Sequence, residues 1–323
     1  MKIAAAVTTC HKTMYKKLVS WSALLACNFM WSLQFLCIKL VQDQVGALST
    51  VFIPVLIASL FMTPFVLKGI KNKKKTWKHL RIFALLAIVG QFPAQILMTY
   101  GTQLSTASNA GIISLTLPIV SALLAVIFLR EKMTPGRWLC FAIAIIGVIF
   151  CSLKDIHNLN TSWAFMVGNL LIFSGVVGSA FYNTICKKIA NDFTEMEMLF
   201  YTYIFLLAIL LPLVVYYEGD ILTRIPEFSR QTWTGLTLLT VFHNFLSMIL
   251  FFVALKKLEA IQVALSNFLI TFFALPIAAI FLQERLSVIS IVGGVMVLIS
   301  TLLITVIEYK KTIRQTQPAL QKE

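Results

Sequence analysis

Charged side chains are scarce in this chain, and acidic ones are the scarcest. Only 12% of the 323 residues are charged, with 13 Asp and Glu against 27 Lys and Arg, while 59% are hydrophobic. About a quarter of the residues in an ordinary soluble domain are charged. The composition therefore excludes a soluble globular protein and indicates a polytopic membrane protein.

The sequence motifs of common catalytic sites are also missing. We find no HExxH, no GxSxG, no carboxylate pair at catalytic spacing and no metal-ligand cluster. A GxxxxGK[ST] phosphate-binding loop is absent too. These absences argue against an integral-membrane enzyme and an ATP-driven pump, and we expect no cofactor and no metal. The six cysteines lie mostly in apolar runs, which is typical of small buried side chains.

What the sequence does contain is long apolar runs. A membrane-spanning helix needs about 20 apolar residues. By that measure we predict ten spans, at approximately 18–39, 47–67, 80–100, 105–129, 136–153, 163–186, 196–217, 232–254, 260–282 and 287–307. The expected fold class is all-α integral membrane, with the lipid bilayer as partner. We expect a cytoplasmic segment at 1–17, an extracytoplasmic linker at 154–162 and a cytoplasmic tail at 308–323.

The basic residues indicate how the chain crosses the membrane. If the N-terminus is cytoplasmic, 22 of the 27 Lys and Arg fall in cytoplasmic segments and five outside. This bias follows the positive-inside rule, so we predict that both termini are cytoplasmic. The net charge of +14 then reflects topology and not a surface for nucleic acid. A cell membrane, specifically the bacterial inner membrane, is the default location, and an organelle is the other option.

The two halves of the chain repeat each other. A shift of 153 residues lays Phe128–Met133 on Phe281–Leu286, and places Gln91 on Asn244 and Ser114 on Asn267. The repeats cover 18–153 and 163–307. Because each has five spans, an odd number, the second must enter the membrane from the opposite side. Such inverted repeats can present related open states to the two sides, as alternating access requires.

Several short motifs recur in this frame: Trp31-Ser32 with Phe35 and Lys39, Ala107 to Pro118, Leu129-Arg130-Glu131 and Gly147, then Ala254 to Leu258, Ala264 to Phe281, Leu282 to Leu286 and Gly293-Gly294. In their order and spacing the chain resembles the drug/metabolite transporter superfamily, specifically its EamA-type branch. The resemblance implies ten helices around a cavity lined mainly by spans 1, 3, 4, 6, 8 and 9, and export as the usual direction. The chain departs from the family at Ser32, where a glycine is common.

The prolines of the two halves do not match. Pro118 lies 13 residues before Glu131, whereas Pro276 lies eight residues before Glu284. We therefore expect the halves to kink at different depths.

Polar residues inside the spans are candidates for the substrate site, because polar groups are costly in lipid and face the bundle interior. Gln91 and Gln95 flank Pro93, whose missing N–H frees a carbonyl. Hydrogen bonds between helices are the competing role for each polar residue. We predict that the substrate contacts Asn28, Trp31, Gln34, Gln91, Gln95, Asn109, Tyr182, His243, Asn244, Gln262 and Asn267.

Six residues are candidates for gating or coupling: His243, Lys39, Glu131, Glu284, Pro93 and Pro118. His243 is the ionisable residue nearest mid-membrane, which suits either a proton carrier or a hydrogen-bonded core histidine. Lys39 either snorkels to the interface or attracts an anionic substrate. Glu131 and Glu284 suit helix-end caps or gate salt bridges as well as coupling groups.

The function that fits these features best is secondary transport of a small polar or amphipathic metabolite, such as an amino acid, by alternating access. The alternatives are a membrane channel or facilitator and an integral-membrane enzyme. Few charged residues lie in the spans, which argues against a multiply charged substrate. Close helix approach at Gly147, Gly293 and Gly294 suits a homodimer as well as packing inside one subunit.

Overall fold

A computed structural model of the chain describes residues 2–69, 77–105, 107–114, 116–130, 132–152 and 163–281, together with isolated residues between 292 and 310. The described residues form helices, turns and short connections without a β-strand. Six segments are long and apolar enough to span a membrane: Leu18–Val41, Ala47–Lys68, Leu80–Leu104, Met166–Ile189, Glu195–Tyr217 and Arg230–Lys257. Leu117–Leu129 and Ala260–Ala274 are shorter apolar helices. The predicted all-α membrane fold is confirmed.

Five helices run without interruption where spans 1, 2, 5, 6 and 7 are predicted. They are α1 (Lys2–Val41), α2 (Ala47–Gly69), α7 (Pro135–Ser152), α8 (Trp163–Ile189) and α9 (Glu195–Tyr217). α1 starts at Lys2, so the segment expected before the first span continues the same helix, while the membrane-spanning part is Leu18–Val41. A capping box of Thr194 and Glu197 fixes the start of α9. The Glu218 carboxylate accepts hydrogen bonds from the backbone N–H groups of Leu48 and Ser49 at the start of α2.

Spans 3 and 8 are irregular at equivalent positions. Span 3 consists of α3 (Trp77–Leu85), the π-helical segments η2 (Leu86–Gln91) and η3 (Pro93–Leu97), and α4 (Met98–Leu104). Span 8 consists of α11 (Arg230–Leu238), the π-helical η6 (Leu239–Leu246) and α12 (Ser247–Lys257). The 153-residue shift places the start of η2 on the start of η6. π-Helical turns are rare and concentrate at functional sites.

Spans 4 and 9 are each broken into two helices, also at equivalent positions. Span 4 divides into α5 (Ala107–Ser114) and α6 (Leu117–Leu129), and span 9 into α13 (Ala260–Ser266) and α14 (Phe268–Phe281). The expectation of kinks at different depths is therefore wrong. Pro276 lies inside α14 without ending it. The break falls at Asn267 because Asn28 donates from its Nδ2 to the carbonyl of Ser266, at 3.0 Å, and so pairs a group that the break leaves free.

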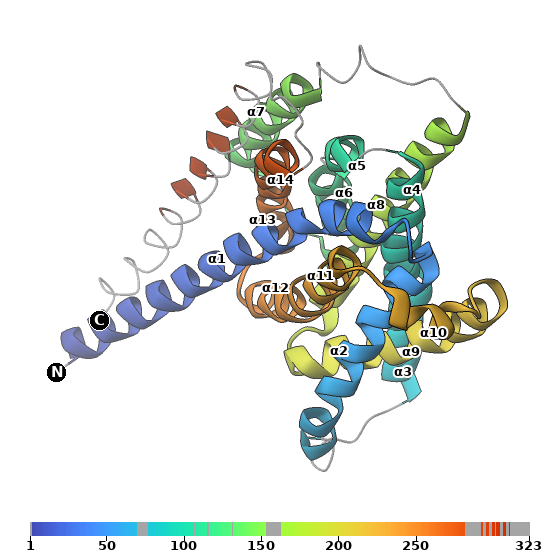
Figure 1. Cartoon of the computed structure of the whole chain (residues 1–323). Helices are drawn as coiled ribbons and strands as arrows, with labels where there is room; N and C mark the ends of the chain where they lie inside the picture. The colour runs from blue at the N-terminus through green and yellow to red at the C-terminus, as the bar shows by residue number, and fades with distance from the viewer. Residues whose placement is uncertain are drawn as a thin grey trace.

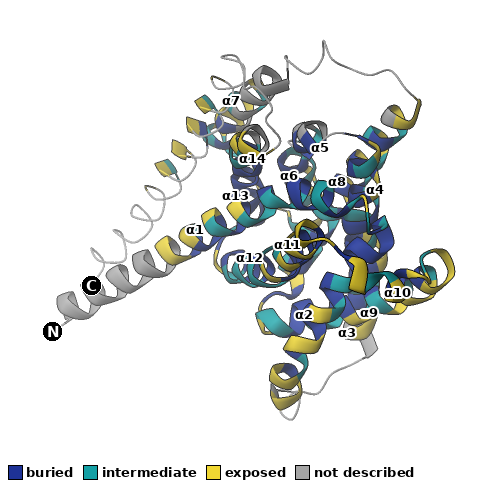
Figure 2. Cartoon of the chain, viewed as in Figure 1, coloured by how far each residue is buried: buried dark blue, intermediate teal, exposed yellow. Residues whose placement is uncertain are grey.

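The two repeats pack on each other reciprocally (Figure 1). α1 packs against α12 and α14 of the second repeat, and α8 packs against α4 and α6 of the first. The two helices of each broken span, which we call half-helices, cross in the same way: α5 packs on α14 and α6 packs on α13. α2 lies against α9. Buried residues gather where these helices meet (Figure 2). Large apolar residues are exposed on the outer surface, as on Phe61 of α2 and Val215 of α9, and form a lipid-compatible face.

The chain between the long helices adds two short elements, α10 (Ile221–Arg224) and the 3-10 turn η5 (Ile225–Glu227). Gln44, after α1, bonds to this region, accepting from the Ser229 N–H at 2.8 Å and donating to the Glu227 carbonyl at 3.1 Å. Some predicted features lie outside the described residues: Glu131, Glu284, the 154–162 linker, most of span 10 and nearly all of the 308–323 tail.

Candidate functional site

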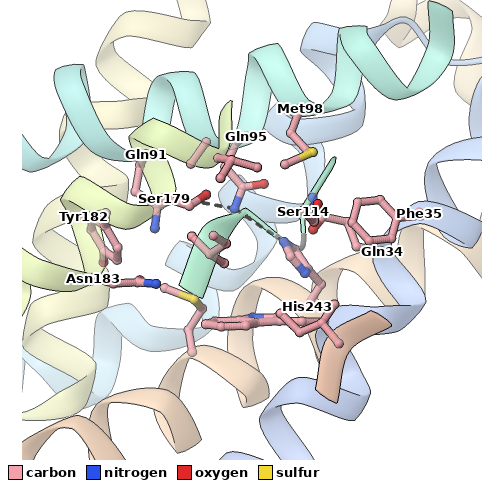
Figure 3. Close-up of a pocket in the computed structure, with 16 residues that line it drawn as sticks. Gln34, Phe35, Gln91, Gln95, Met98, Ser114, Ser179, Tyr182, Asn183 and His243 are labelled. Carbon is pink, nitrogen blue, oxygen red and sulfur yellow. Dashed lines mark hydrogen bonds between the residues drawn. The ribbon is translucent and has the colours of Figure 1, made fainter. Parts of the chain in front are cut away.

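A cavity of about 80 Å³ lies between the two repeats. α1 and α8 form two facing walls, spans 3 and 8 supply the irregular segments between them, and the half-helices add the remainder (Figure 3). The lining residues are Trp31, Gln34, Phe35, Gln91, Ala94, Gln95, Met98, Ser114, Leu117, Val176, Ser179, Tyr182, Asn183, His243, Met248 and Ile270. No Asp, Glu, Lys or Arg belongs to this set, so a substrate there meets dipoles and rings and no full charge.

The α1 and α8 walls use equivalent positions with different chemistry. A shift of 148 residues places Trp31 on Ser179, Gln34 on Tyr182 and Phe35 on Asn183. All six line the cavity. The i, i+3, i+4 spacing puts the three residues of each helix on one face. The α1 wall offers two apolar rings and one amide, whereas the α8 wall offers two hydroxyl groups and one amide.

Gln95 is the centre of the polar contacts at the cavity. Its Nε2 donates to the Gln91 Oε1 and to the Asn244 Oδ1, both at 3.4 Å, and lies 3.5 Å from the Nε2 of His243. Two of these contacts appear as dashed lines in Figure 3. Gln91 and Asn244 are equivalent under the 153-residue shift, so Gln95 joins a duplicated pair across the two repeats. These distances are long for hydrogen bonds, and a ligand can compete for the Gln95 amide.

His243 and Trp31 each bring a hydrogen-bonding group to the cavity. The Gln95 Nε2 and the His243 Nε2 lie 3.5 Å apart, and the role of the imidazole nitrogen there depends on the histidine tautomer. The His243 Nδ1 and the Trp31 Nε1 are buried without a hydrogen-bond partner among the described residues. Leaving a buried donor unpaired costs about 1–3 kcal/mol. Both nitrogens thus lack a partner in this conformation, although their side chains line the cavity.

Four predicted site residues lie away from the main cavity, and three of them hydrogen-bond to helix backbone. Asn28 bonds to Ser266, as described above. The Asn244 Nδ2 donates to the carbonyl of Leu239 within η6, at 3.0 Å. The Gln262 Oε1 accepts from the Glu259 N–H in a capping box at the start of α13. Asn267 lines a separate small cavity. The fifth, Asn109, lies in α5, with its side chain outside the described residues.

The small cavity lies beside the main one. Its volume is about 10 Å³, enough for roughly one water molecule. It shares Asn183 with the main cavity and is otherwise lined by Ser121, Thr184, Leu255, Ala260, Val263, Ala264 and Asn267. The Ser121 hydroxyl and both amide atoms of Asn267 have no hydrogen-bond partner among the described residues. Polar groups thus continue from the main cavity toward the end of α12.

Three of the gating candidates, Lys39, Pro93 and Pro118, lie at the ends or beginnings of helical segments. Lys39 is half-buried and donates to main-chain carbonyls at the end of α4. Pro93 begins η3, and Pro118 lies in the first turn of α6, just after the break in span 4. Pro118 therefore sits where a missing N–H costs little, whereas Pro93 lies within the continuous helical span 77–104.

Sequence reasoning missed several lining residues, among them Met98, Ser179, Asn183 and Met248. Two of them had a signal in the sequence. The 148-residue register between α1 and α8 points from Trp31 and Phe35 to Ser179 and Asn183. The methionines had none, because an apolar residue in a span suits lipid and cavity alike.

The chain was compared with known proteins. A model described as the EamA-like transporter family matches residues 19–153 and 166–306. This chain belongs to the EamA-like transporter family. Its class of activity is therefore transport of a small molecule across a membrane, and not enzymatic catalysis.

Individual relatives are distant but cover much of the chain. An S-adenosylmethionine uptake transporter of Rickettsia conorii is 24% identical over 86% of this chain and 88% of its own length. An uncharacterized transporter, YetK, of Bacillus subtilis is 21% identical over 73% of this chain and 71% of its own. A solved structure titled "Crystal structure of protein" aligns with a TM-score of 0.70 at 13% identity, covering 92% of this chain and 98% of that one. The last likeness concerns the fold alone.

Proposed function

We propose that this EamA-like transporter is a secondary carrier of a small uncharged or zwitterionic metabolite, such as an amino acid or a related compound. The observation that carries the proposal is the central cavity. It lies between two reciprocally packed repeats, and amide, hydroxyl, imidazole and ring groups line it without a charged side chain. Such a lining binds a polar molecule without holding a multiply charged one.

The lining also suggests how the substrate is oriented. The unpaired donors at Trp31 Nε1 and His243 Nδ1 suit an acceptor such as a carbonyl or a carboxylate. The rings of Trp31 and Phe35 on α1 suit an apolar group, and the hydroxyl groups and the amide on α8 suit a hydrogen-bonding one. The expected substrate is amphipathic.

The reciprocal packing supports transport by alternating access. The main helix contacts between the repeats have counterparts, as expected for repeats related by a two-fold axis in the membrane plane. In this arrangement both termini are cytoplasmic, the membrane is the cell membrane, and the repeats are those predicted at 18–153 and 163–307. Export remains our prediction for the direction.

S-adenosylmethionine is a candidate that the names of the Rickettsia relatives raise. A cavity of about 80 Å³ is well below the 300–1,000 Å³ of typical ligand pockets. The amino-acid end of that molecule suits such a space better than its nucleoside. We therefore favour a smaller substrate and treat S-adenosylmethionine as a compound to be tested.

The test begins with a thermal-shift screen of the purified protein against amino acids, related metabolites and S-adenosylmethionine, because a ligand of the native state raises the apparent melting temperature. A hit is then carried into liposome flux measurements. Saturable uptake with counterflow is expected of a carrier. Flux that does not saturate and shows no counterflow would identify a channel or facilitator instead.

A further inference from the structure

Lys39 holds the end of α1 against the end of α4. Its Nζ donates to the main-chain carbonyl of Ser105 at 2.8 Å, to that of Gln103 at 3.4 Å and to the Gln42 Oε1 at 3.1 Å. Ser105 is the residue that ends α4, and its own hydroxyl donates to the Oδ1 of Asn169 on α8 at 2.9 Å. Lys39 therefore joins the end of α1 to the end of α4, and Ser105 joins that end of α4 to α8.

Lys187 makes the equivalent contact in the second repeat. Its Nζ donates to the carbonyl of Leu258, at 2.5 Å, and to that of Leu255. Leu258 is the residue that ends α12. The 148-residue shift that matches the cavity walls places Lys39 on Lys187, and the 153-residue shift places Ser105 on Leu258. The two lysines thus bind equivalent places in the two repeats: the connection between α4 and α5 in the first, and the connection between α12 and α13 in the second.

These contacts are suited to opening and closing. The last carbonyls of a helix have no partner within it, and a lysine there pairs with them and with the negative end of the helix dipole. Both lysine side chains are half-buried, so water can replace the helix carbonyls when the ends separate. At the Lys187 end, the small polar cavity reaches Leu255, whose carbonyl the lysine binds. This cavity shares Asn183 with the main one, so it lies between the main cavity and the helix end that Lys187 binds.

We propose that Lys39 and Lys187 are the two gates of the transporter and are released alternately. The inference rests on the proposed alternating-access function. Release of Lys39 from the end of α4 opens the cavity to one side of the membrane, and release of Lys187 from the end of α12 opens it to the other. In the present structure both lysines are engaged, and the cavity between the repeats has a volume of about 80 Å³.

The experiment measures access to the cavity in the full-length protein, without need of the substrate. A cysteine at position 179 (Ser179→Cys) reports on the α8 wall, and labelling by a membrane-impermeant thiol reagent is quantified at that peptide by mass spectrometry. Peptide mapping keeps the natural cysteines from interfering. Right-side-out and inverted membrane vesicles give the two sides separately.

Replacement by methionine removes the charge and the donors but keeps the length of the side chain. Lys39→Met is expected to raise labelling from the side at which α4 ends by about tenfold, since losing hydrogen bonds from a charged donor shifts a two-state equilibrium by about that factor. Lys187→Met is expected to raise labelling from the opposite side by a similar factor. Gln at either position, which keeps one donor, should give a smaller change in the same direction.

Lys257→Met is the matched control, because Lys257 lies exposed at the end of α12. It should leave both labelling rates unchanged. Each variant must elute as a single species in detergent, and the Gln variants replace any Met variant that does not. Unchanged labelling in both lysine variants, or a rise from the same side in both, would overturn the gates while leaving the carrier proposal intact.

Discussion

At the scale of single residues, the polar side chains of the spans divide into those that line the cavity and those that hydrogen-bond to unpaired backbone groups of the helices. Gln91 and Gln95 line the cavity. The side-chain amides of Asn244 and Gln262 instead hydrogen-bond to the backbone of their own helices. The sequence alone could show that such residues must avoid lipid. It could not show which of the two uses each one has, because that depends on where the backbone leaves a carbonyl or an N–H unpaired.

His243 is the residue for which this division matters most. Its Nδ1 has no partner among the described residues, so we expect it to act as a neutral donor to the substrate and not as the carrier of a coupled proton. Asparagine places an amide N–H near the position of Nδ1. His243→Asn should therefore keep substrate affinity within about threefold, while His243→Leu, which lacks the donor, should lose about tenfold.

The same variants separate the two roles by pH. Uptake by His243→Asn, measured in proteoliposomes between about pH 5.5 and pH 8, should follow the profile of the unmodified protein. If the profile becomes flat while affinity is retained, His243 is the proton carrier and the donor role is excluded.

At the scale of the elements, the positions of the spans could be predicted, but their interruptions could not. Apolar runs locate helices because each run must cross the bilayer. The break at Asn267 has no proline to announce it, and Asn28, which donates to the Ser266 carbonyl there, is 238 residues from Ser266 along the chain. Proline position therefore misled the expectation of unequal kinks, and both breaks lie next to the duplicated pair Ser114 and Asn267.

Glycines govern how closely α8 approaches span 3. A Cβ on Gly178 would lie 2.8 Å from the Pro93 Cβ and 2.9 Å from the Gly90 carbonyl oxygen. Gly178→Ala should therefore push α8 away from η2 and η3 and cost about 1–3 kcal/mol. We expect a lower melting temperature in detergent and weaker substrate binding, because Ser179 and Tyr182 move with the helix.

Gly111→Ala is the matched control for this prediction. The nearest heavy atom to a Cβ at Gly111 is the Cβ of Ala274, at 4.0 Å, so the added methyl group fits. The substitution also replaces glycine in the helix α5 by a residue that favours helix. Its melting temperature should equal or exceed that of the unmodified protein. Equal losses in the two variants would show that close packing of α8 on span 3 is not what Gly178 provides.

At the scale of the whole molecule, the repeats complete each other. α1 of the first repeat packs against α12 and α14 of the second, and α8 of the second packs against α4 and α6 of the first. Side chains from both repeats line the central cavity. The duplication could be seen in the sequence, but this exchange of partners could not, because a sequence shift shows which segments are alike and not which ones touch.

The exchange of partners predicts how the chain behaves when it is divided. Residues 1–157 and 158–323, expressed as two chains, should form a complex that copurifies through a tag on either one, because each repeat buries its faces against the other. Either half expressed alone should be degraded or aggregate, since the faces of α1 and α8 that pack on the opposite repeat would lack their partners. As a control, division after Leu206, a buried residue in the middle of α9, should give no complex. A half that is stable and monodisperse alone would show that each repeat folds independently. The reciprocal packing would then form between two repeats that are already folded.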